Sequence, residues 1–585
     1  MKITKSMFAL AMAVAMILSM AMPAIADDHT NHTITINENN SGHTYVAYQI
    51  FAGTVEVKDQ TTGTAVLSDV DWGDAINPAK VADILSALKH PTNNSQFAHL
   101  YTGIEDTLST KEIAKKVSEA LAKENTSLAS INFAKIMKNF AVNPKISQKY
   151  ASLDDPDPMD PDEDGDIACY KITGLNDGYY MIVEAGNGSE FESETRTHYM
   201  LRLVNDITIK PKAEKVTSYI NIKEGIHYRD FCADNIGDIA EIVVTGSVPE
   251  YFDRFQNGFV YDIAVQLPNG ISLVESSDIK VSTVNGDSIQ EIPSESAYKV
   301  YKSDTEISTE VVGDIADKYD DGTDLLVRIY NLAAVTTNAI TKDTELILTF
   351  KASLNADAIT GNFGDVNNQA NDLDCGNVIT AYVAFSQDPY DANAMGKTVS
   401  DSVSVFTFKV DVTKIDGTNQ SPLEGVEFKL YRKRTQDETT VLQYATVSND
   451  KISGWTTNEG EAATFTSDDD GKFSIIGLDA DTYFLKETLG FVGYNTMEDL
   501  EFSVTADYKD NPKKLSLLSI QAKDALNATP GVFDNGSLAL TVINNPGSLL
   551  PSTGGIGTTI FYVVGGILVA GAAVLLITRK RMEKE

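Results

Sequence analysis

Three aspartates in the first third of the chain have the spacing of cation ligands. Asp160, Asp162 and Asp164 lie two residues apart and are followed by Gly165, which fits the opening of a calcium-binding loop. The twelfth position of such a loop is normally a glutamate, and here it is Lys171. The surrounding segment is dense in aspartate and proline, so a solvated acidic loop without metal is the alternative interpretation.

Other patterns that carry catalytic chemistry are sparse. All seven histidines lie at or before His227, which argues against a zinc site or a Ser-His-Asp triad in the rest of the chain. The sequence has no nucleophile elbow, no metal-ligand cluster and no glycine-rich phosphate loop. We therefore predict a protein that is not an enzyme and that uses no cofactor.

The two ends of the chain predict export and anchoring. Residues 1–26 combine a charged start, an apolar core and a small-residue cleavage site, as in a secretory signal. An apolar run from Ile556 to about Thr578 is long enough to cross a bilayer as a helix. Arg579, Lys580 and Arg581 follow it and favour the cytoplasmic side. Everything between the two segments is expected outside the cell.

The net charge, cysteine count and length of the chain limit its partners and its architecture. The formal net charge is -36 over 585 residues, and such a surface repels nucleic acid. Three cysteines are few for an exported protein of this size, so a disulfide framework is not what holds it together. The length suggests three or four domains.

The residue pattern of most of the exported part predicts β-strands. Alternating apolar residues separated by turn residues occur in all three of its parts, which predicts tandem Ig-like β-sandwiches of mainly β class. In the first part, Tyr45–Phe51 and Thr54–Val57 are expected as separate strands. The predicted divisions are the signal segment 1–26, the first domain 27–212, the middle domain 213–405, the third domain 406–547 and the C-terminal sorting and membrane segment 548–585.

The first domain also contains a predicted helical insertion. Val81, Ile84, Leu85 and Leu88 recur at helical spacing. A second helix is expected over Leu108–Ala122 and a third over Ile131–Phe140, and the second begins with a plausible capping sequence. We therefore expect helices packed onto the strands of this domain.

The segment before the apolar run resembles a sorting signal. Leu550, Pro551, Ser552, Thr553 and Gly554 are similar to the LPXTG signal of Gram-positive surface proteins. In that family a membrane-bound sortase cuts between the threonine and the glycine and passes the threonine carbonyl to an amine. The resemblance implies sortases and peptidoglycan as partners and a location on the cell wall. A tail-anchored protein that carries this pentapeptide by chance is the alternative.

Four segments of the third domain carry a further resemblance: Val412–Asp416, Gly425–Phe428, Tyr483–Thr488 with Gly493–Tyr494, and Val542–Asn544. As a set they resemble the isopeptide-forming (CnaB-like, SpaA-type) domain of Gram-positive pilins, whose E-box supplies a glutamate. The resemblance covers about 140 residues.

The resemblance assigns three reacting groups to this domain. In the family a lysine on the first strand attacks the carboxamide of an asparagine on the last strand, and ammonia leaves. Mapped onto this chain, Lys414 is the nucleophile, Asn544 the acceptor and Glu487 the helper acid. An amine attacks only when it is neutral, and burial among apolar side chains favours that form. The alternative is a surface lysine, a strand-end asparagine and a solvated glutamate.

The middle domain resembles a pilin domain whose crosslink is lost. The segments that carry this resemblance are Ile236–Asp238, Val243–Pro249, Leu267–Gly270 and Ala381–Ser386 with Asp388–Pro389. The family's reacting positions align with Ile220, Val265 and Ile379, which cannot react.

Polar residues near these three positions allow a second interpretation, in which the middle domain keeps a reactive set. A shift of one or two residues in the alignment would bring in Lys215, Lys223, Asp262 or Asn377. Cys232 and Cys375 flank the first and last strands, so a disulfide in place of the lost link is a further hypothesis.

The end of the first domain is similar to the pilin motif, a strand that ends in Tyr-Pro-Lys. The corresponding segment is Asp206–Lys212, and Lys212 is the matching lysine, although Lys210 stands where the family has tyrosine. In the family this lysine accepts the threonine carbonyl of the next subunit. Lys210 and Lys215 are further candidates for the same role.

Together these resemblances imply a backbone subunit of a covalent, sortase-assembled pilus on the cell surface. The expected partners are pilin-class and housekeeping sortases, other copies of the chain, accessory pilins and peptidoglycan. The alternative is a monomeric wall-anchored adhesin, or a minor tip or basal pilin, that binds a host glycoprotein or matrix. Whether the first domain carries its own crosslink is left open.

Overall fold

The computed structural model of the chain describes most of the exported part and the C-terminal helix. The described residues are 30–38, 43–59, 64–91, 95–124, 127–154, 157–159, 167–186, 195–196, 198–211, 215–255, 258–274, 279–294, 297–302, 322–335, 340–360, 376–389, 391–436, 439–510, 513–523, 528–530, 537–547 and 556–583.

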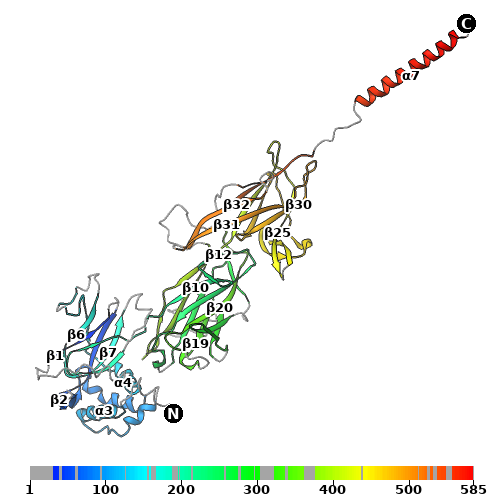
Figure 1. Cartoon of the computed structure of the whole chain (residues 1–585). Helices are drawn as coiled ribbons and strands as arrows, with labels where there is room; N and C mark the ends of the chain where they lie inside the picture. The colour runs from blue at the N-terminus through cyan, green and yellow to red at the C-terminus, as the bar shows by residue number, and fades with distance from the viewer. Residues whose placement is uncertain are drawn as a thin grey trace. The chain divides into compact units, whose positions relative to one another are not determined.

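The chain is mainly β, with helices in its first part and at its C-terminus (Figure 1). This confirms the predicted fold class. The chain divides into two compact units, one of residues 1–407 with 508–516 and one of residues 408–507 with 517–585. The first and middle predicted domains fall in the first of these units, and the boundary between them stays a prediction.

Two sheets form the β-part of the first domain, and their core lies between them. In the order of pairing, the strands of the first sheet are β5 (Gln148–Tyr150), β6 (Cys169–Asn176), β1 (Thr30–Ile36) and β9 (Ile207–Ile209). Those of the second are β3 (Thr64–Trp72), β2 (His43–Asp59), β7 (Gly178–Gly186) and β8 (His198–Leu203), with β4 (Lys145–Ile146) on β2.

The long strand β2 corrects one prediction. Two strands were expected on either side of Gly53, but the structure has one strand of 17 residues. Its register shifts where it pairs with β3, between Ala52 and Thr54. A Cβ at Gly53 would lie 2.7 Å from the carbonyl oxygen of Ser68. Glycine therefore permits a bulge here and does not end the strand.

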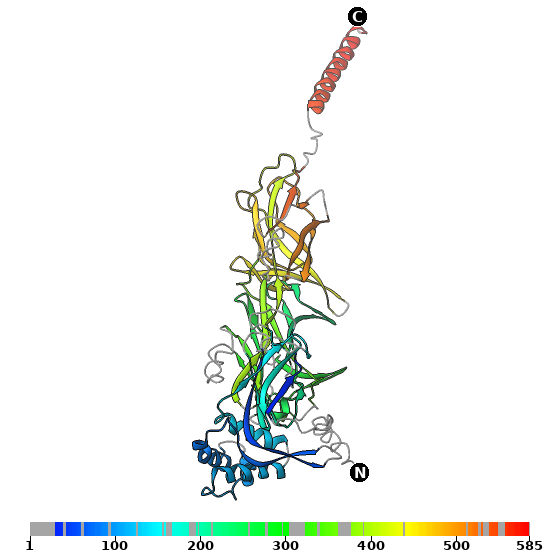
Figure 2. The same cartoon turned by 90° about the vertical axis from the view of Figure 1, so that its left-hand side faces the viewer.

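The predicted helical insertion is present and packs onto β2, β3 and β7 (Figure 2). The first helix buries Val81, Ile84, Leu85 and Leu88, as its spacing predicts. At the next helix the backbone amide of Ser109 donates to the Glu112 carboxylate at 3.0 Å, and the Glu112 amide donates to the Oγ of Ser109 at 3.3 Å, which forms a capping box. The helical segments are η1 (Pro78–Lys80), α2 (Val81–Lys89), η2 (Ser95–Leu100), α3 (Thr110–Glu124) and α4 (Ser127–Lys138).

The middle domain is a sandwich of two larger sheets around one continuous apolar core. One sheet contains β11 (His227–Arg229), β10 (Ser218–Glu224), β13 (Ile239–Ser247), β20 (Glu345–Leu354), β16 (Lys280–Asn285) and β17 (Ser288–Glu291), with β15 (Ile271–Leu273) on β20. The other contains β12 (Phe231–Ala233), β23 (Asp401–Phe406), β21 (Asn377–Asp388), β14 (Tyr261–Gln266), β19 (Leu325–Ile329) and β18 (Lys299–Lys302), with β22 (Asp391–Lys397) on β21. Short 3-10 turns are η3 (Phe252–Arg254) and η6 (Leu332–Ala334).

The third domain is also built from two sheets. The smaller contains β29 (Lys472–Leu478), β24 (Phe408–Asp416), β34 (Leu538–Asn544) and β33 (Ala528–Pro530). The larger contains β27 (Lys451–Thr456), β26 (Thr439–Ser448), β25 (Glu427–Gln436), β30 (Thr482–Leu489), β31 (Leu500–Asp510) and β32 (Lys513–Ala522), with β28 (Phe465–Thr466) on β25 and the turn η7 (Glu459–Glu461).

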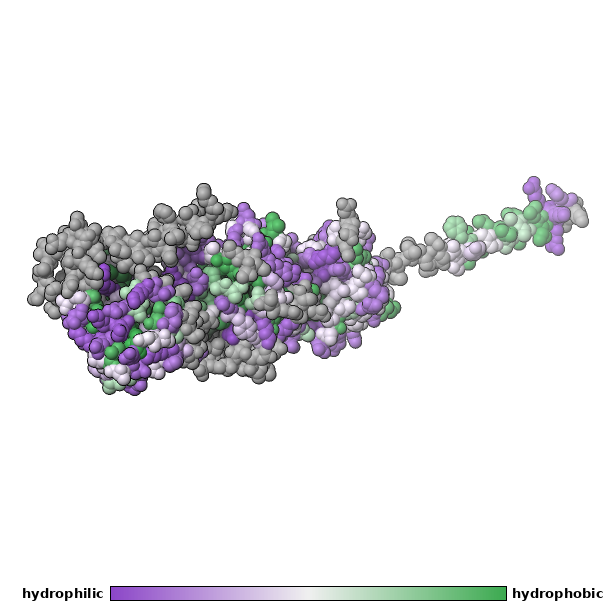
Figure 3. Space-filling view, turned by 90° about the horizontal axis from the view of Figure 1, so that it is seen from below, coloured by the Kyte–Doolittle hydropathy of each residue, from purple (hydrophilic) through white to green (hydrophobic). Residues whose placement is uncertain are grey.

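The C-terminal helix α7 (Ile556–Met582) has the composition of a membrane span. Within Gly557–Met582, an 18-residue window has a mean hydropathy of 2.6, and in the described part of the chain this stretch alone is long and apolar enough to cross a bilayer. Figure 3 shows the helix apolar along most of its length and hydrophilic at its end, where Arg579, Lys580 and Arg581 lie.

Candidate crosslinking site

Two neighbouring strands of the third domain bring Lys414 and Asn544 into the core. On β24 and on β34 every second residue is buried, so the strand period of two fixes which side chains face inward. Lys414 and Asn544 both fall on the buried set. The strands run parallel, with Asp416 opposite Asn544. The lysine is therefore a diagonal neighbour of the asparagine, within reach of a long side chain.

The facing sheet supplies the third group. Glu487 lies near the end of β30, whose sheet packs on the other side of the core, and it is also buried. Lys414 Nζ lies 2.7 Å from Asn544 Oδ1 and 3.4 Å from Glu487 Oε2. The Asn544 Nδ2 donates to both carboxyl oxygens of Glu487, at 3.1 and 3.0 Å. The three residues named from the sequence thus form one contact group.

Burial makes Lys414 an unusual lysine. It has no exposed surface, and among the residues that the structure describes it is the only lysine that is buried. Desolvation lowers the pKa of Lys414 to about 8, although the charge of Glu487 and a hydrogen bond to it act in the opposite direction. About a tenth of this amine is therefore neutral at pH 7, far more than for an ordinary lysine, and a nucleophilic amine must be neutral.

Side chains that the sequence analysis did not single out complete the apolar walls of the site. Met497 Sδ lies 3.5 Å from Lys414 Nζ, and the amine lies 5.4 Å from the centre of the Phe428 ring. Phe428 belongs to a segment that carries the family resemblance, but nothing in the sequence placed Met497 here. A Cβ at Gly490 would approach Glu487 Oε1 to 2.7 Å, so glycine lets the chain turn close to the carboxyl group.

The middle domain has apolar residues at the aligned positions. Ile220 on β10, Val265 on β14 and Ile379 on β21 are all fully buried members of one core cluster. Apolar side chains fill a core without the desolvation cost of a lysine and an acid. The burial of these residues supports the hypothesis that this domain has no isopeptide bond, which stays a prediction.

The nearby polar groups of the middle domain do not form an alternative site in the described part of the chain. Lys223 pairs at 2.7 Å with a glutamate of β13, and Asp262 pairs at 2.7 Å with Arg328. The Asn377 amide bonds to backbone groups of β23 and of the loop before β21. Lys215 is exposed. These four residues are therefore occupied elsewhere or face solvent.

The cysteine hypothesis is not decided by the structure. Cys232 is buried, and its Sγ lies 3.5 Å from Asp234 Oδ2, whereas Cys375 lies outside the described residues. Cys169 is buried in the first domain, where its Sγ lies 3.9 Å from the carbonyl oxygen of Ser152. Desolvation raises the pKa of the Cys169 thiol, which makes it less reactive.

Several other predicted site residues lie outside the described part of the chain. The described residues contain no group of three or more His, Cys, Asp or Glu side chains that could hold a metal ion. Lys210 directly follows β9 and is exposed. The predicted residues outside the described part are the signal segment, Asp160, Asp162, Asp164, Lys212 and the pentapeptide Leu550–Gly554.

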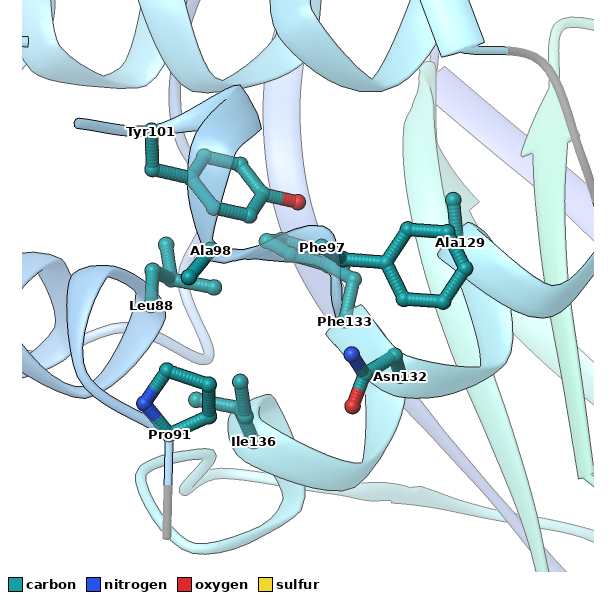
Figure 4. Close-up of a pocket in the computed structure, with 9 residues that line it drawn as sticks. All are labelled: Leu88, Pro91, Phe97, Ala98, Tyr101, Ala129, Asn132, Phe133 and Ile136. Carbon is teal, nitrogen blue, oxygen red and sulfur yellow. The ribbon is translucent and has the colours of Figure 1, made fainter. Parts of the chain in front are cut away.

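The helices of the first domain leave one small apolar gap (Figure 4). Leu88, Tyr101, Phe133 and Ile136 are among the residues that surround it, and a water-sized sphere finds no room inside. Because a binding pocket for a small molecule needs several hundred Å³, this gap belongs to the packing of the helices.

A buried ion cluster connects the helical part of the first domain with β21 of the middle domain. Asp388, at the end of β21, lies 2.9 Å from His198 Nε2, 2.9 Å from Lys138 Nζ and 3.8 Å from Arg196 Nη1. Burial alone raises the pKa of Asp388, but hydrogen bonds and charges from His198 and Lys138 outweigh it and hold the pKa well below its usual range. In the sequence, Asp388 stands out only as part of a segment that carries the family resemblance.

Replacing Asp388 by asparagine should lower the unfolding free energy of the compact unit formed by residues 1–407 and 508–516. The change removes the negative charge of the carboxylate that these basic groups contact, and breaking a buried charge cluster costs about 2 kcal/mol or more of unfolding free energy. Differential scanning calorimetry of the Asp388→Asn chain checks this, with the exposed Asp391→Asn as control. Equal melting temperatures for the two variants would show that the cluster contributes nothing to stability.

Two segments of the chain match known sequence families. Residues 408–517 match the SpaA family, described as a prealbumin-like fold domain. Residues 543–584 match the LPXTG cell wall anchor motif. The matched segments include Lys414 and Glu487 in the first case and Asn544 with the predicted sorting signal in the second. The comparison with curated proteins finds no match for this chain.

Among solved structures, the chain is similar to subunits of Gram-positive pili. The T6 backbone pilin of serotype M6 Streptococcus pyogenes has 11% identity and a TM-score of 0.48, with 90% of this chain and 100% of that chain covered. The full-length major pilin SpaD from Corynebacterium diphtheriae has 15% identity and a TM-score of 0.43, with 90% and 100% covered. The major pilin SpaA of the same organism has 13% identity and a TM-score of 0.42, with 88% and 100% covered.

Proposed function

We propose that this chain, a cell-wall-anchored surface protein with a prealbumin-like SpaA domain and an LPXTG anchor motif, is the shaft subunit of a covalently polymerised pilus. A sortase cleaves it after Thr553 and transfers the threonine carbonyl to a lysine of the next copy, for which Lys212 is the first candidate. The observation that carries this proposal is the anchor match over residues 543–584, because it supplies the electrophilic end that a polymer needs.

An intramolecular crosslink stabilises the subunit in this proposal. The neutral Nζ of Lys414 attacks Cγ of Asn544, and a new Nζ–Cγ amide bond replaces the Cγ–Nδ2 bond. Nδ2 leaves as ammonia with the proton that the amine gives up, and Glu487 passes that proton between them. The contacts of 2.7 Å between amine and amide and of 3.0 Å between amide and carboxyl support this assignment. The fixed contact replaces a bimolecular encounter with an intramolecular step.

Replacing Lys212 by alanine should abolish the polymer. A shaft subunit with no acceptor amine can still be cleaved, but it cannot receive the next copy. Electrophoresis of boiled cell-wall extracts should show a ladder of high-mass bands for the unchanged chain and single subunits for Lys212→Ala. Lys210→Ala and Lys215→Ala serve as matched controls, since both lysines lie nearby and are exposed.

Two results of this experiment would change the proposal. A ladder that survives in Lys212→Ala and collapses in Lys210→Ala or Lys215→Ala would move the acceptor to that lysine. An unchanged chain that occurs on the wall only as single subunits would reject the shaft function and favour a wall-anchored adhesin. Peptide mapping of the branched junction identifies the acceptor directly.

A further inference from the structure

The last residue of β30 and the loop that follows this strand carry exposed apolar side chains. Leu489 and Phe491 are exposed, and Val492 is 93% exposed. No charged residue lies between Leu489 and Tyr494. Exposed apolar residues next to one another on a soluble domain are a mark of an interaction surface. We name residues 489–494 the exit loop.

Two contacts hold the base of the exit loop against β24. Tyr494 packs edge-on against Phe491 with ring centres 5.4 Å apart, and its hydroxyl donates to Asp416 Oδ2 at 2.7 Å. The loop begins two residues after Glu487 of the crosslinking site. Its apolar tip is therefore held in a fixed position at one end of β24 and β30, which lowers the entropy cost of docking.

The exit loop touches the chain where it leaves the third domain. Gly547 N donates to Gly493 O at 2.9 Å, and Asn495 N donates to Asn545 O at 3.1 Å. Thr553 lies only six positions after Gly547, a span of at most about 22 Å even when fully extended. A copy that is joined to Thr553 is thereby tethered beside the exit loop.

The first domain offers an exposed apolar side chain at the sheet end where Lys210 follows β9. β9 ends at Ile209, opposite Ile36 of β1, and Ile36 is paired with Tyr170 of β6. Leu153 follows the strand paired with the start of β6, and its side chain is 48% exposed. An exposed apolar side chain thus lies at the same end of this sheet as Lys210.

We infer that the exit loop is a docking surface for the first domain of the next copy, seated at the end of the sheet that carries Leu153 and Lys210. This inference rests on the proposed function. The contact is small, since a stable free interface buries about 1,200 Å² or more. The covalent tether raises the effective concentration of the two surfaces, so a small apolar contact suffices to orient the subunits.

Photocrosslinking in assembled polymer tests the docking surface. The full chain is produced in cells that hold its sortases, with p-benzoylphenylalanine in place of Val492. The expected result is a crosslink, mapped by mass spectrometry, from position 492 to residues 145–211 of another copy. The matched control is the same replacement of Leu442, an exposed apolar residue of β26 that pairs opposite Lys433. Lys433 lies six positions along β25 from Glu427, the residue that pairs with Leu489. The control position is therefore far from the exit loop, and it should give about tenfold less of the crosslink to residues 145–211.

Each other outcome overturns the docking surface. A crosslink from position 492 to lipid, to a sortase or to peptidoglycan would assign the loop to another partner. A normal ladder without the crosslink would reject the docking surface and leave the shaft function standing. The absence of any ladder in the unchanged chain would reject both. As a second variant, Val492→Asp should lower the amount of ladder about tenfold with the same amount of subunit, because it removes the burial of a valine.

Discussion

The Asn544→Ala chain should lose about 5 kcal/mol of unfolding free energy in its third domain, because the crosslink to Lys414 cannot form. Lys414 and Asn544 are 130 positions apart. A covalent bond across a loop of this length removes a large part of the conformational entropy of the unfolded chain. Few single substitutions have so large an effect on stability.

Intact mass and calorimetry check this expectation together. The unchanged mature chain should be lighter than its sequence by about 17 Da, the mass of one ammonia, and Asn544→Ala should show no such loss. Lys409→Ala is the matched control, because Lys409 lies on the same strand but pairs with Asp411 at the surface. It should retain the mass loss and melt almost as the unchanged chain does.

A second variant separates the crosslink from packing. Glu487→Gln keeps the shape of the side chain but removes the group that carries the proton, so it should keep the full mass of the sequence. If Asn544→Ala and Glu487→Gln still show the loss of ammonia, the site assignment is wrong. A loss of two ammonia molecules from the unchanged chain would mean that the middle domain is also crosslinked, contrary to our prediction.

The three residues of the site were predicted from the resemblance of the motif segments, and the period of the strands explains why two of them face the core. Alternation along β24 and β34 turns Lys414 and Asn544 to the same buried side, and the motif segments give their order in the chain. The position of Met497 against the amine could not be predicted, because it depends on how a loop folds back. The helices were placed within a few residues: the third was expected to start at Ile131 and starts at Ser127.

Contacts between distant parts of the sequence were the least predictable. Asp388 is separated by 250 residues from Lys138, with which it pairs, and no periodicity links the two. A single Asp-Pro dipeptide has the signature of a turn, and that signature gives no information about a distant partner. The bulge at Gly53 was missed for a related reason: glycine is typical of turns and of bulges alike, and only the neighbouring strand distinguishes them.

Formation of the crosslink should depend steeply on pH in the neutral range. Only the neutral amine of Lys414 attacks, and desolvation lowers its pKa to about 8. The neutral fraction rises from about 1% at pH 6 to about half at pH 8, so the initial rate should rise about fiftyfold over this interval and level off above about pH 9. A lysine with an ordinary pKa would continue to gain about tenfold per pH unit up to about pH 10.

Refolding of unlinked chain measures this dependence. Full-length protein is recovered unfolded, refolded at pH values from 6 to 10, and sampled over time for the loss of ammonia. Tyrosine fluorescence of the Glu487→Gln variant, which folds without reacting, provides the folding rate at each pH and shows where folding limits the reaction. A crosslinking rate that is independent of pH while folding is fast would mean that proton loss from Lys414 does not control the reaction. A rate that continues to rise to pH 10 would mean that the amine is not desolvated before it attacks. Lys414 would then become buried only after the crosslink has formed.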